Sequence, residues 1–198
     1  MQKTSWGIVL ALWGAGLGAA AQYGKFSVIF DQLSEIYPDA GASLGFVVSV
    51  VGFVGIVFGI VAGLMVARIR YRRALLIALW AGAALSLFQA LLPPLPWMLA
   101  SRLLEGLSHL AIVVAAPTLI AHVAAPKDRG FALTLWGTFF GVAFAILTWG
   151  GVPLAVTAGI PALLAAHGIY MAGFAIFLAR RLRTLYVDVT PPVSVRQV

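Results

Sequence analysis

The polar residues best placed for chemistry lie in stretches that are otherwise almost wholly apolar. Arg102, Glu105 and His109 are spaced at i, i+3 and i+7, so a helix would present them on one face. Gln22 and Lys25 lie in an earlier apolar stretch with the same i, i+3 spacing. A carboxylate beside cations can bind an anionic group or exchange a proton as its surroundings change. These five residues are the candidate binding residues, and no residue is a candidate catalytic group.

The elements that must position these residues are membrane-spanning helices. The chain has 198 residues, of which 62% are hydrophobic and 10% charged, whereas soluble domains carry roughly 25% charged residues. One span takes about 20 apolar residues. We expect an all-α polytopic membrane protein with six helices, at approximately 6–30, 44–66, 74–92, 97–123, 131–149 and 153–179. Short connections rich in Pro, Gly or charge separate them, the shortest being a turn at Gly150-Gly151.

The basic residues set the expected orientation. A formal net charge of +7 would suggest nucleic acid in a soluble protein. Here the Lys and Arg residues fall on alternate connections: Lys3; Arg68, Arg70, Arg72 and Arg73; Lys127 and Arg129; Arg180, Arg181, Arg183 and Arg196. The positive-inside rule then places both termini in the cytoplasm, with an even number of spans. We expect a multi-pass protein of the bacterial inner membrane whose surroundings are the lipid bilayer, and no nucleic-acid partner.

Enzyme and metal chemistry find little support. The chain has no Cys, and it contains no H-E-x-x-H, Walker or dinucleotide-binding pattern. Residues 41–45 match G-x-S-x-G, but Ser43 opens one predicted helix while His167 lies about 20 Å along another. We therefore expect no enzyme, no metal site and no cofactor.

A structural interpretation of the polar residues competes with the functional one. Arg102 and Glu105 could pair along a single helix, while Lys25 extends to the outer headgroups. His109 could bond to a neighbouring backbone group. Ionisable groups inside a membrane cost about 2.5–3.5 kcal/mol each on insertion scales, which favours a bundle interior or a wet cavity.

Two stretches of the chain match each other after a shift of 85 residues. Gly45-Phe46, Ser49 and Gly52 then align with Gly130-Phe131, Thr134 and Gly137. The offset corresponds to three predicted spans. Because three is odd, the second triplet would be inserted upside down, which predicts an inverted 3+3 repeat.

Glycines recur at every fourth residue on the predicted second and fifth helices. They are Gly55, Gly59 and Gly63 on the former, and Gly137 and Gly141 on the latter. Small residues at this spacing allow helix backbones to approach closely in a membrane. We expect these glycines to pack helices together, or to form a sliding surface between moving helices.

Three motifs resemble those of the N-terminal half of a major facilitator superfamily transporter, and the resemblance covers nearly the whole chain. Residues 63–73 are similar to motif A, G-x-L-x-D-R-x-G-R-R. Its glycine and basic positions are filled by Gly63, Arg68, Arg72 and Arg73, whereas Ala67 and Arg70 stand where the pattern has Asp and Gly. The resemblance implies a contact that latches the two halves of the transporter in one access state. Because Ala67 replaces the carboxylate of the motif, that latch is in doubt.

Two further motifs lie on the fourth and fifth predicted helices. Arg102 and Gly106 resemble motif B, R-x-x-x-G, which implies that Arg102 faces a central cavity. Asp128 and Arg129 belong to a turn that resembles P-x-x-R-G-x-A. Motif C of the antiporters is absent because Gly141 and its neighbours lack the proline, which disfavours a proton/drug antiporter.

The resemblance implies one half of a transporter. Residues 1–183 would form a six-helix bundle, and residues 184–198 a cytoplasmic tail or the start of an interdomain linker. A second half would come from the same chain beyond residue 198, from another chain or from a second copy. The resemblance implies secondary active transport by alternating access, in half-size or truncated form. The two cations Lys25 and Arg102 against the one carboxylate of Glu105 favour a small anionic organic solute, with protons as the candidate coupling ion. The alternative is a transport-inactive scaffold or assembly factor.

Overall fold

The computed structural model describes residues 3–184, which form helices and turns without any strand. The long helices are α1 (Trp6–Ser27), α3 (Leu44–Ile69), α4 (Tyr71–Gln89), α5 (Leu95–Val123) and α9 (Ile160–Arg181). One further span is continuous from α6 (Arg129–Gly137) through α7 (Phe139–Ile146) and the π-helical η2 (Leu147–Gly151) to α8 (Val152–Ala158). The short elements are α2 (Phe30–Ile36), η1 (Pro38–Ser43) and η3 (Leu182–Thr184). The predicted tail lies outside the described residues except for Thr184.

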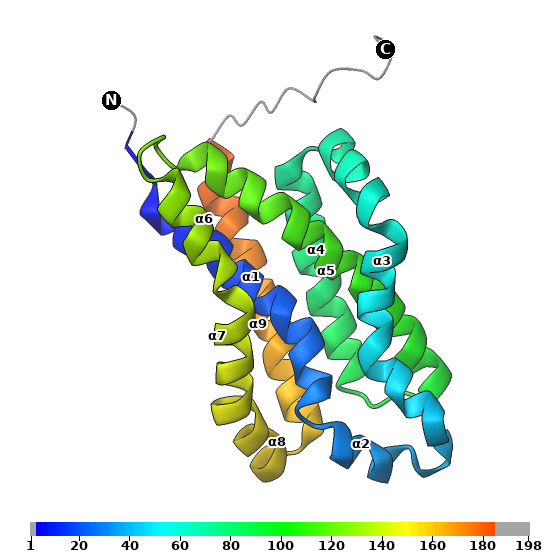
Figure 1. Cartoon of the computed structure of the whole chain (residues 1–198). Coiled ribbons are helices and arrows are strands. Elements are labelled where there is room, and N and C mark those ends of the chain that lie inside the picture. Colours follow the sequence, from blue (N-terminus) through cyan, green and yellow to red (C-terminus); the bar gives the residue numbers. More distant parts are fainter. Residues whose placement is uncertain (1–2, 185–198) are drawn as a thin grey trace.

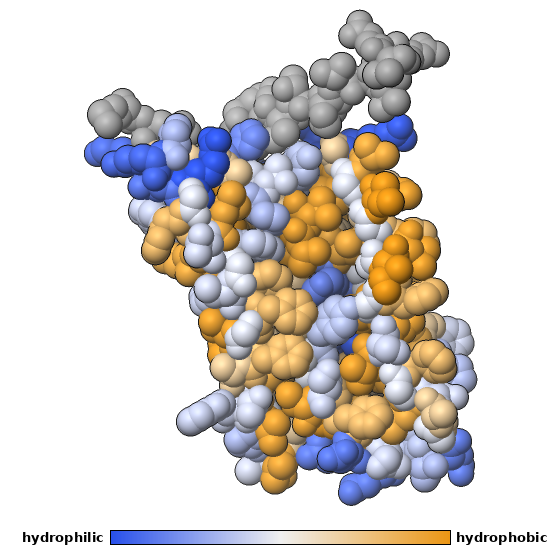
Figure 2. Space-filling model, viewed as in Figure 1, coloured by the Kyte–Doolittle hydropathy of each residue, from blue (hydrophilic) through white to orange (hydrophobic). Residues whose placement is uncertain are grey.

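The helices have the length and surface of membrane spans. Five segments, Pro38–Ile69, α4, α5, Arg129–Ala158 and α9, are long and apolar enough to cross a bilayer. Large apolar side chains face outward, for example Ile56 and Ile60, which are 83% and 90% exposed. Hydrophilic residues gather at the two ends of the face in Figure 2, with a broad apolar region between them. The chain is therefore the predicted all-α, multi-pass membrane protein.

The first predicted span, α1, is not among these five segments, and it contains several glycines, Gln22 and Lys25. It still runs along the bundle beside the other long helices (Figure 1). The helix is mostly buried inside the protein. Its polar residues therefore face other helices rather than lipid.

Helix α5 is the centre around which the other helices pack. It lies against α1, α3 and α4, while α9 packs on α4 and α1, and α7 packs on α1. Helix α1 begins at the same end of the bundle at which α9 ends (Figure 1). The α3–α4 connection and the α5–α6 turn lie at that end too, so the basic residues of these connections gather on one side.

The two spans that the predicted inverted repeat pairs with each other run in opposite directions. Helix α3 runs toward the end that holds the basic connections, and the α6–α8 span runs away from it (Figure 1). Ser49 Oγ donates to the Gly45 carbonyl at 3.1 Å, and Thr134 Oγ1 donates to the Gly130 carbonyl at 3.0 Å. The matched positions thus make the same hydrogen bond one turn back along their helices.

The predicted turn at Gly150-Gly151 is wrong. Both glycines lie inside helical structure, in a π-helical turn just before Pro153, and the chain reverses at Gly159 instead. Gly159 has φ +87° and ψ 158°, a conformation open essentially to glycine alone. Pro153 lies in the first turn of α8, next to the widened π turn, where its missing N–H is tolerated. The fifth span therefore ends at Ala158, and the sixth begins at Ile160.

The connection predicted for residues 31–43 contains helices. The first span ends at Ser27, earlier than predicted, and α2 and η1 follow it. Gly41 has φ +50° inside η1 and marks the kink there. Tyr37 between these two elements donates a hydrogen bond to the Pro93 carbonyl at 2.7 Å, which ties this connection to the one before α5.

The glycines predicted to pack helices do not do so within the described bundle. A Cβ at Gly55, Gly59, Gly63, Gly137 or Gly141 would have no described atom within 4 Å. Other glycines make the close approaches instead: a Cβ at Gly14 would lie 2.4 Å from Phe174, and one at Gly106 2.9 Å from Val54. A period of four residues indicates a face of small residues but cannot say what that face meets.

Candidate functional site

A fully buried cluster of polar side chains lies where α1, α4, α5 and α9 meet. We call it the charge cluster; it consists of Lys25, Ser86, Gln89, Arg102, Glu105 and His167. Lys25 comes from α1, Arg102 and Glu105 from α5, and the others from α4 and α9. The relative exposure is 0% for every member except His167, at 6%. The cluster is thus screened from lipid and solvent alike.

Glu105 is the centre of this cluster. Its Oε1 lies 2.6 Å from Lys25 Nζ, and its Oε2 accepts from Gln89 Nε2 at 2.9 Å. Arg102 forms an ion pair with the same Oε2 from one turn earlier on α5. The carboxylate is therefore fully engaged by protein donors and leaves little room for a solute at its own oxygens.

Lys25 links α1 to three other helices. Its ammonium donates to Ser86 Oγ at 2.5 Å, to Gln89 Oε1 at 2.8 Å and to Glu105. His167 Nδ1 lies 3.3 Å from the same ammonium and 2.6 Å from Ser86 Oγ. Ser86, Gln89 and Glu105 use all three N–H groups of the lysine, so the ammonium is held in place rather than extended toward a headgroup.

His167 has its tautomer set by its neighbours. The Gly18 carbonyl, 2.9 Å from Nε2, can only accept a hydrogen bond, so Nε2 carries the proton. Nδ1 faces the Lys25 ammonium, which cannot accept a proton, so Nδ1 is unprotonated and accepts from the Ser86 hydroxyl. The ring is therefore a neutral bridge between α1 and α4.

Arg102 ties three helices together. Its Nε donates to the Val47 carbonyl of α3 at 2.7 Å, and Nη1 donates to the Gln22 carbonyl of α1 at 2.7 Å. The guanidinium also lies over the Phe26 ring, 4.5 Å from its centroid. Nη2 has no hydrogen-bond partner among residues 3–184. One donor group of a buried cation therefore stays unused.

Four of the five predicted binding residues are connected in this region, and the fifth lies beside it. Gln22 Nε2 donates to Ser108 Oγ at 3.0 Å, while its Oε1 lacks a partner within the described part of the chain. His109 is only half-buried: its Nδ1 lies 2.8 Å from the Ala19 carbonyl, and its ring meets Tyr23 edge-on at 5.1 Å. The proposed headgroup role of Lys25 does not fit these contacts. The binding role of all five residues remains a prediction.

Sequence reasoning missed three members of the charge cluster. The spacing patterns do not single out Ser86, Gln89 or His167 as binding residues. The available signal was that Ser86 and Gln89 stand at i, i+3 in the apolar α4, the same spacing as Arg102 and Glu105. Nothing in the chain pattern brings His167 to Lys25, because 142 residues separate them.

The chemistry of the cluster is that of a buried, unbalanced charge. Two cations, Lys25 and Arg102, face one carboxylate, and the ring of His167 is neutral. Isolated charge in a low-dielectric interior is costly, so one further anionic group would be favoured there. Within residues 3–184 no group of three or more His, Asp or Glu side chains could hold a metal ion.

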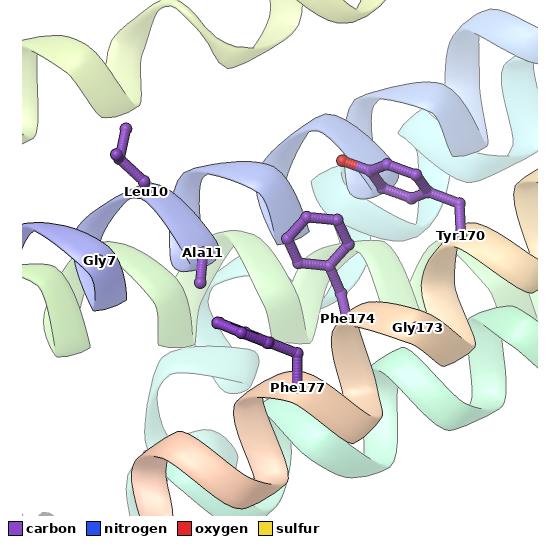
Figure 3. Close-up of a pocket in the computed structure, with 7 residues that line it drawn as sticks. All are labelled: Gly7, Leu10, Ala11, Tyr170, Gly173, Phe174 and Phe177. Atoms are coloured by element: carbon purple, nitrogen blue, oxygen red, sulfur yellow. The ribbon is translucent and has the colours of Figure 1, made fainter.

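Cavities of about 530 and 490 Å³ are not lined by any charged residue. A cavity of about 530 Å³ lies between α1 and α9, lined by Leu10, Tyr170, Phe174 and Phe177 among others. Figure 3 shows the three aromatic side chains in a row along α9, facing α1. The Tyr170 hydroxyl already donates to the Gly14 carbonyl at 2.7 Å. This cavity offers apolar surface only, and we do not assign a charged solute to it.

A smaller cavity touches the charge cluster. It has a volume of about 270 Å³ and lies between α1, α7, η2, α8 and α9. His167 lines it, together with apolar residues and Tyr170. His167 therefore separates this cavity from the Lys25 ammonium.

The residues that resemble the conformational motifs lie around the basic end of the bundle. Arg72 Nη2 donates to the Ala179 carbonyl of α9 at 3.4 Å, and Asp128 Oδ2 accepts from Thr4 Oγ1 at 2.5 Å. Arg68, Arg73 and Arg129 are exposed, and Gly63 is half-buried. Arg70, which replaces the motif's glycine, has φ +77°, the conformation that a glycine would adopt most easily.

Of three comparisons with known proteins, one found a match, and it agrees with this architecture. A search of curated proteins and a search of solved structures each gave no match. The family model described as Major Facilitator Superfamily matches residues 9–197. That match covers all the long helices together with the motif-like residues at the basic end. On this ground the chain belongs to the major facilitator superfamily, a family of membrane transporters.

Proposed function

We propose that the chain forms one six-helix half of a secondary transporter that moves a small anionic organic solute by alternating access. The charge cluster supplies the observation that carries this proposal. It holds two buried cations against one carboxylate, and Nη2 of Arg102 has no partner in the described structure. A carboxylate or phosphate on the solute would accept from this nitrogen and offset the excess charge.

Access to the cluster requires helices to move. Arg102 bonds to the Val47 carbonyl of α3 and to the Gln22 carbonyl of α1, so shifting either helix away from α5 would uncover the guanidinium. The half-buried rings of Tyr23 and His109 meet beside this region, where His109 Nδ1 lies 2.8 Å from the Ala19 carbonyl of α1. We assign Gln22, Lys25, Arg102, Glu105 and His109 to this solute path.

A second six-helix half is part of the proposal. The small-residue faces of α3 and of α6–α7 are open in the described bundle. A second half from the same chain, another chain or a second copy would pack on these faces and rock against them. The motif residues Gly63, Arg68, Arg72, Arg73, Asp128 and Arg129 would act at the basic end of that boundary.

Uptake into proteoliposomes tests the proposal. The full chain is reconstituted and offered a panel of radiolabelled small carboxylates and phosphate esters. Arg102→Lys keeps the charge but loses the guanidinium fork, so we expect uptake of the transported anion to fall at least tenfold, equivalent to about 1.4 kcal/mol. Arg180→Lys, an exposed change on α9, is the matched control. Unchanged uptake by a folded Arg102→Lys variant would remove Arg102 from the solute path.

Full burial of the charge cluster favours a second candidate, a transport-inactive scaffold or assembly factor. In that case Lys25, Arg102 and Glu105 hold the bundle together, and the open glycine faces dock another membrane protein. Because the chain has no Cys, Ser101→Cys places a single thiol beside Arg102 with little change in volume. Reaction with a small charged thiol reagent, slowed by solute, supports transport. A thiol that never reacts, while Ser34→Cys in the exposed connection α2 reacts normally, supports the scaffold.

A further inference from the structure

An apolar groove of about 490 Å³ runs between α3, α4 and α5. Both α3 and α4 pack along α5 but make few contacts with each other, which leaves the groove between them. Its walls include Phe58, Val61 and Met65 from α3, and Ile77 and Ala81 from α4. The groove is lined almost wholly by carbon atoms and is separate from the charge cluster.

The groove opens toward the bilayer. Met65 and Ile77 are 54% and 62% exposed, and Phe58 and Val61 are 44% and 47% exposed. Side chains this apolar on a membrane-spanning helix face lipid tails. A tail can therefore lie in the groove without displacing any protein group.

The groove has the length of one leaflet. Its α3 wall extends from Phe58 to Ile69 at the end of the helix, and a helical rise of 1.5 Å per residue makes this distance about 16 Å. Half of a hydrocarbon core of about 30 Å is about 15 Å. The groove thus extends from near the middle of the membrane to the boundary at the α3–α4 connection.

Two arginines lie at that boundary, each on the same helix face as the residues that form one wall of the groove. Arg68 follows Val61 and Met65 by seven and three residues, so it continues the α3 wall. Arg73 precedes Ile77 and Ala81 by four and eight residues, so it continues the α4 wall. Both are exposed, and α3 and α4 contain no Asp or Glu that could neutralise them.

From this geometry we propose that the groove binds one acyl chain of an anionic phospholipid, whose phosphate is held by Arg68 and Arg73. The acyl chain exchanges its contacts with neighbouring lipid tails for contacts with the groove walls. The guanidiniums of Arg68 and Arg73 bind the lipid headgroup at the membrane boundary. The bound lipid fills the space between α3 and α4, so it stabilises their present spacing. The proposal requires no solute, and it gives Arg68 and Arg73 a lipid partner in addition to the boundary role proposed above.

Lipid titration of the full chain in detergent tests the site. Binding of dioleoylphosphatidylglycerol and dioleoylphosphatidylcholine is followed by native mass spectrometry and by the thermal unfolding midpoint. We expect the anionic lipid to bind at least tenfold more tightly. Arg68→Gln/Arg73→Gln should abolish this preference, while Lys127→Gln/Arg180→Gln, the same charge loss elsewhere at the basic end, should preserve it. Equal binding of both lipids by the wild-type chain, or equal loss in both double variants, would overturn the proposal.

Two further measurements distinguish binding of an acyl chain in the groove from electrostatic attraction of the headgroup alone. Ala81→Trp fills the groove and should weaken binding of the anionic lipid at least tenfold, and glycerophosphoglycerol, which has no acyl chains, should not compete. A photoactivatable diazirine in the acyl chain of phosphatidylglycerol should label the wild-type protein at Phe58–Ile69 or at Ile77, which requires no variant to fold. Labelling confined to other helices, or full competition by glycerophosphoglycerol, would show that no chain occupies the groove.

Discussion

The Lys25 ammonium lies 2.6 Å from the Glu105 carboxylate, although 80 residues separate them along the chain. The pair joins α1 to α5 with both side chains fully buried. Arg102, on the same helix as Glu105, forms an ion pair with the other oxygen of that carboxylate. One acidic residue is thus shared by two cations, and this imbalance determines how each substitution should act.

Glu105→Gln should destabilise the protein more than Lys25→Met. The first change leaves two buried cations without a carboxylate, whereas the second leaves the neutral Arg102–Glu105 pair. Removing one partner of a buried pair costs about 3–5 kcal/mol. We expect a loss of that size for Glu105→Gln and a smaller one for Lys25→Met. The free energy of unfolding, measured by titration with a denaturing detergent, gives the order, and a reversed order would show that the excess charge is already neutralised.

His167→Leu should lower the free energy of unfolding by about 1–3 kcal/mol, because it removes the two hydrogen bonds that the ring makes with the buried Gly18 carbonyl and Ser86 hydroxyl. His122→Leu is the matched control. His122 is exposed and contacts only the Thr118 carbonyl of its own helix in the described hydrogen bonds. We expect it to change stability by less than about 0.5 kcal/mol. The same unfolding titration checks both variants, and similar losses in the two would argue against a bridging role for His167.

Gly159→Ala and Gly150→Ala should have opposite effects. Gly159 has φ +87°, so a side chain there strains the backbone by about 1–3 kcal/mol. Gly150 is helical and an added Cβ would meet no described atom within 4 Å, so alanine there should be neutral or stabilise by up to about 1 kcal/mol. Thermal unfolding midpoints in detergent compare the two. A larger loss at Gly150 would instead place the chain reversal at Gly150-Gly151.

Arg70→Gly should be more stable than Arg70→Ala by about 1 kcal/mol. Both substitutions remove the same side chain, so their difference isolates the backbone conformation at φ +77°. Alanine retains the steric cost of this positive φ, and glycine does not. Unfolding of the two variants in parallel measures the difference. Equal stability would mean that the backbone at residue 70 relaxes freely.

Hydropathy and charge were enough to predict the membrane spans. Long apolar runs must be helical in lipid because every backbone polar group needs an internal partner. The predicted spans therefore agree with the start of α3 and the end of α5, and differ by two or three residues at the other ends of α3, α4 and α5. The predicted boundary between the fifth and sixth spans was wrong. Gly150, Gly151 and Pro153 usually end a helix, but here a π turn accommodates them within one continuous span.

The candidate site was predictable only in part. Helical spacing identified Arg102 and Glu105 as neighbours on α5, and Gln22 and Lys25 as neighbours on α1. It could not show that Lys25 and Glu105 pair, or that Ser86, Gln89 and His167 join them, since these contacts depend on how separate helices pack.

By itself, the sequence determined that this protein crosses a membrane as an all-helical bundle with its basic residues gathered on alternate connections. These properties follow from transfer of each residue between water and hydrocarbon, which needs no knowledge of the neighbours. Only the tertiary structure decided that the charged residues lie inside the bundle and that the glycine faces of α3 and α6–α7 remain open. Which face of one helix meets which face of another depends on side-chain packing between distant segments, and that information is absent from any local pattern.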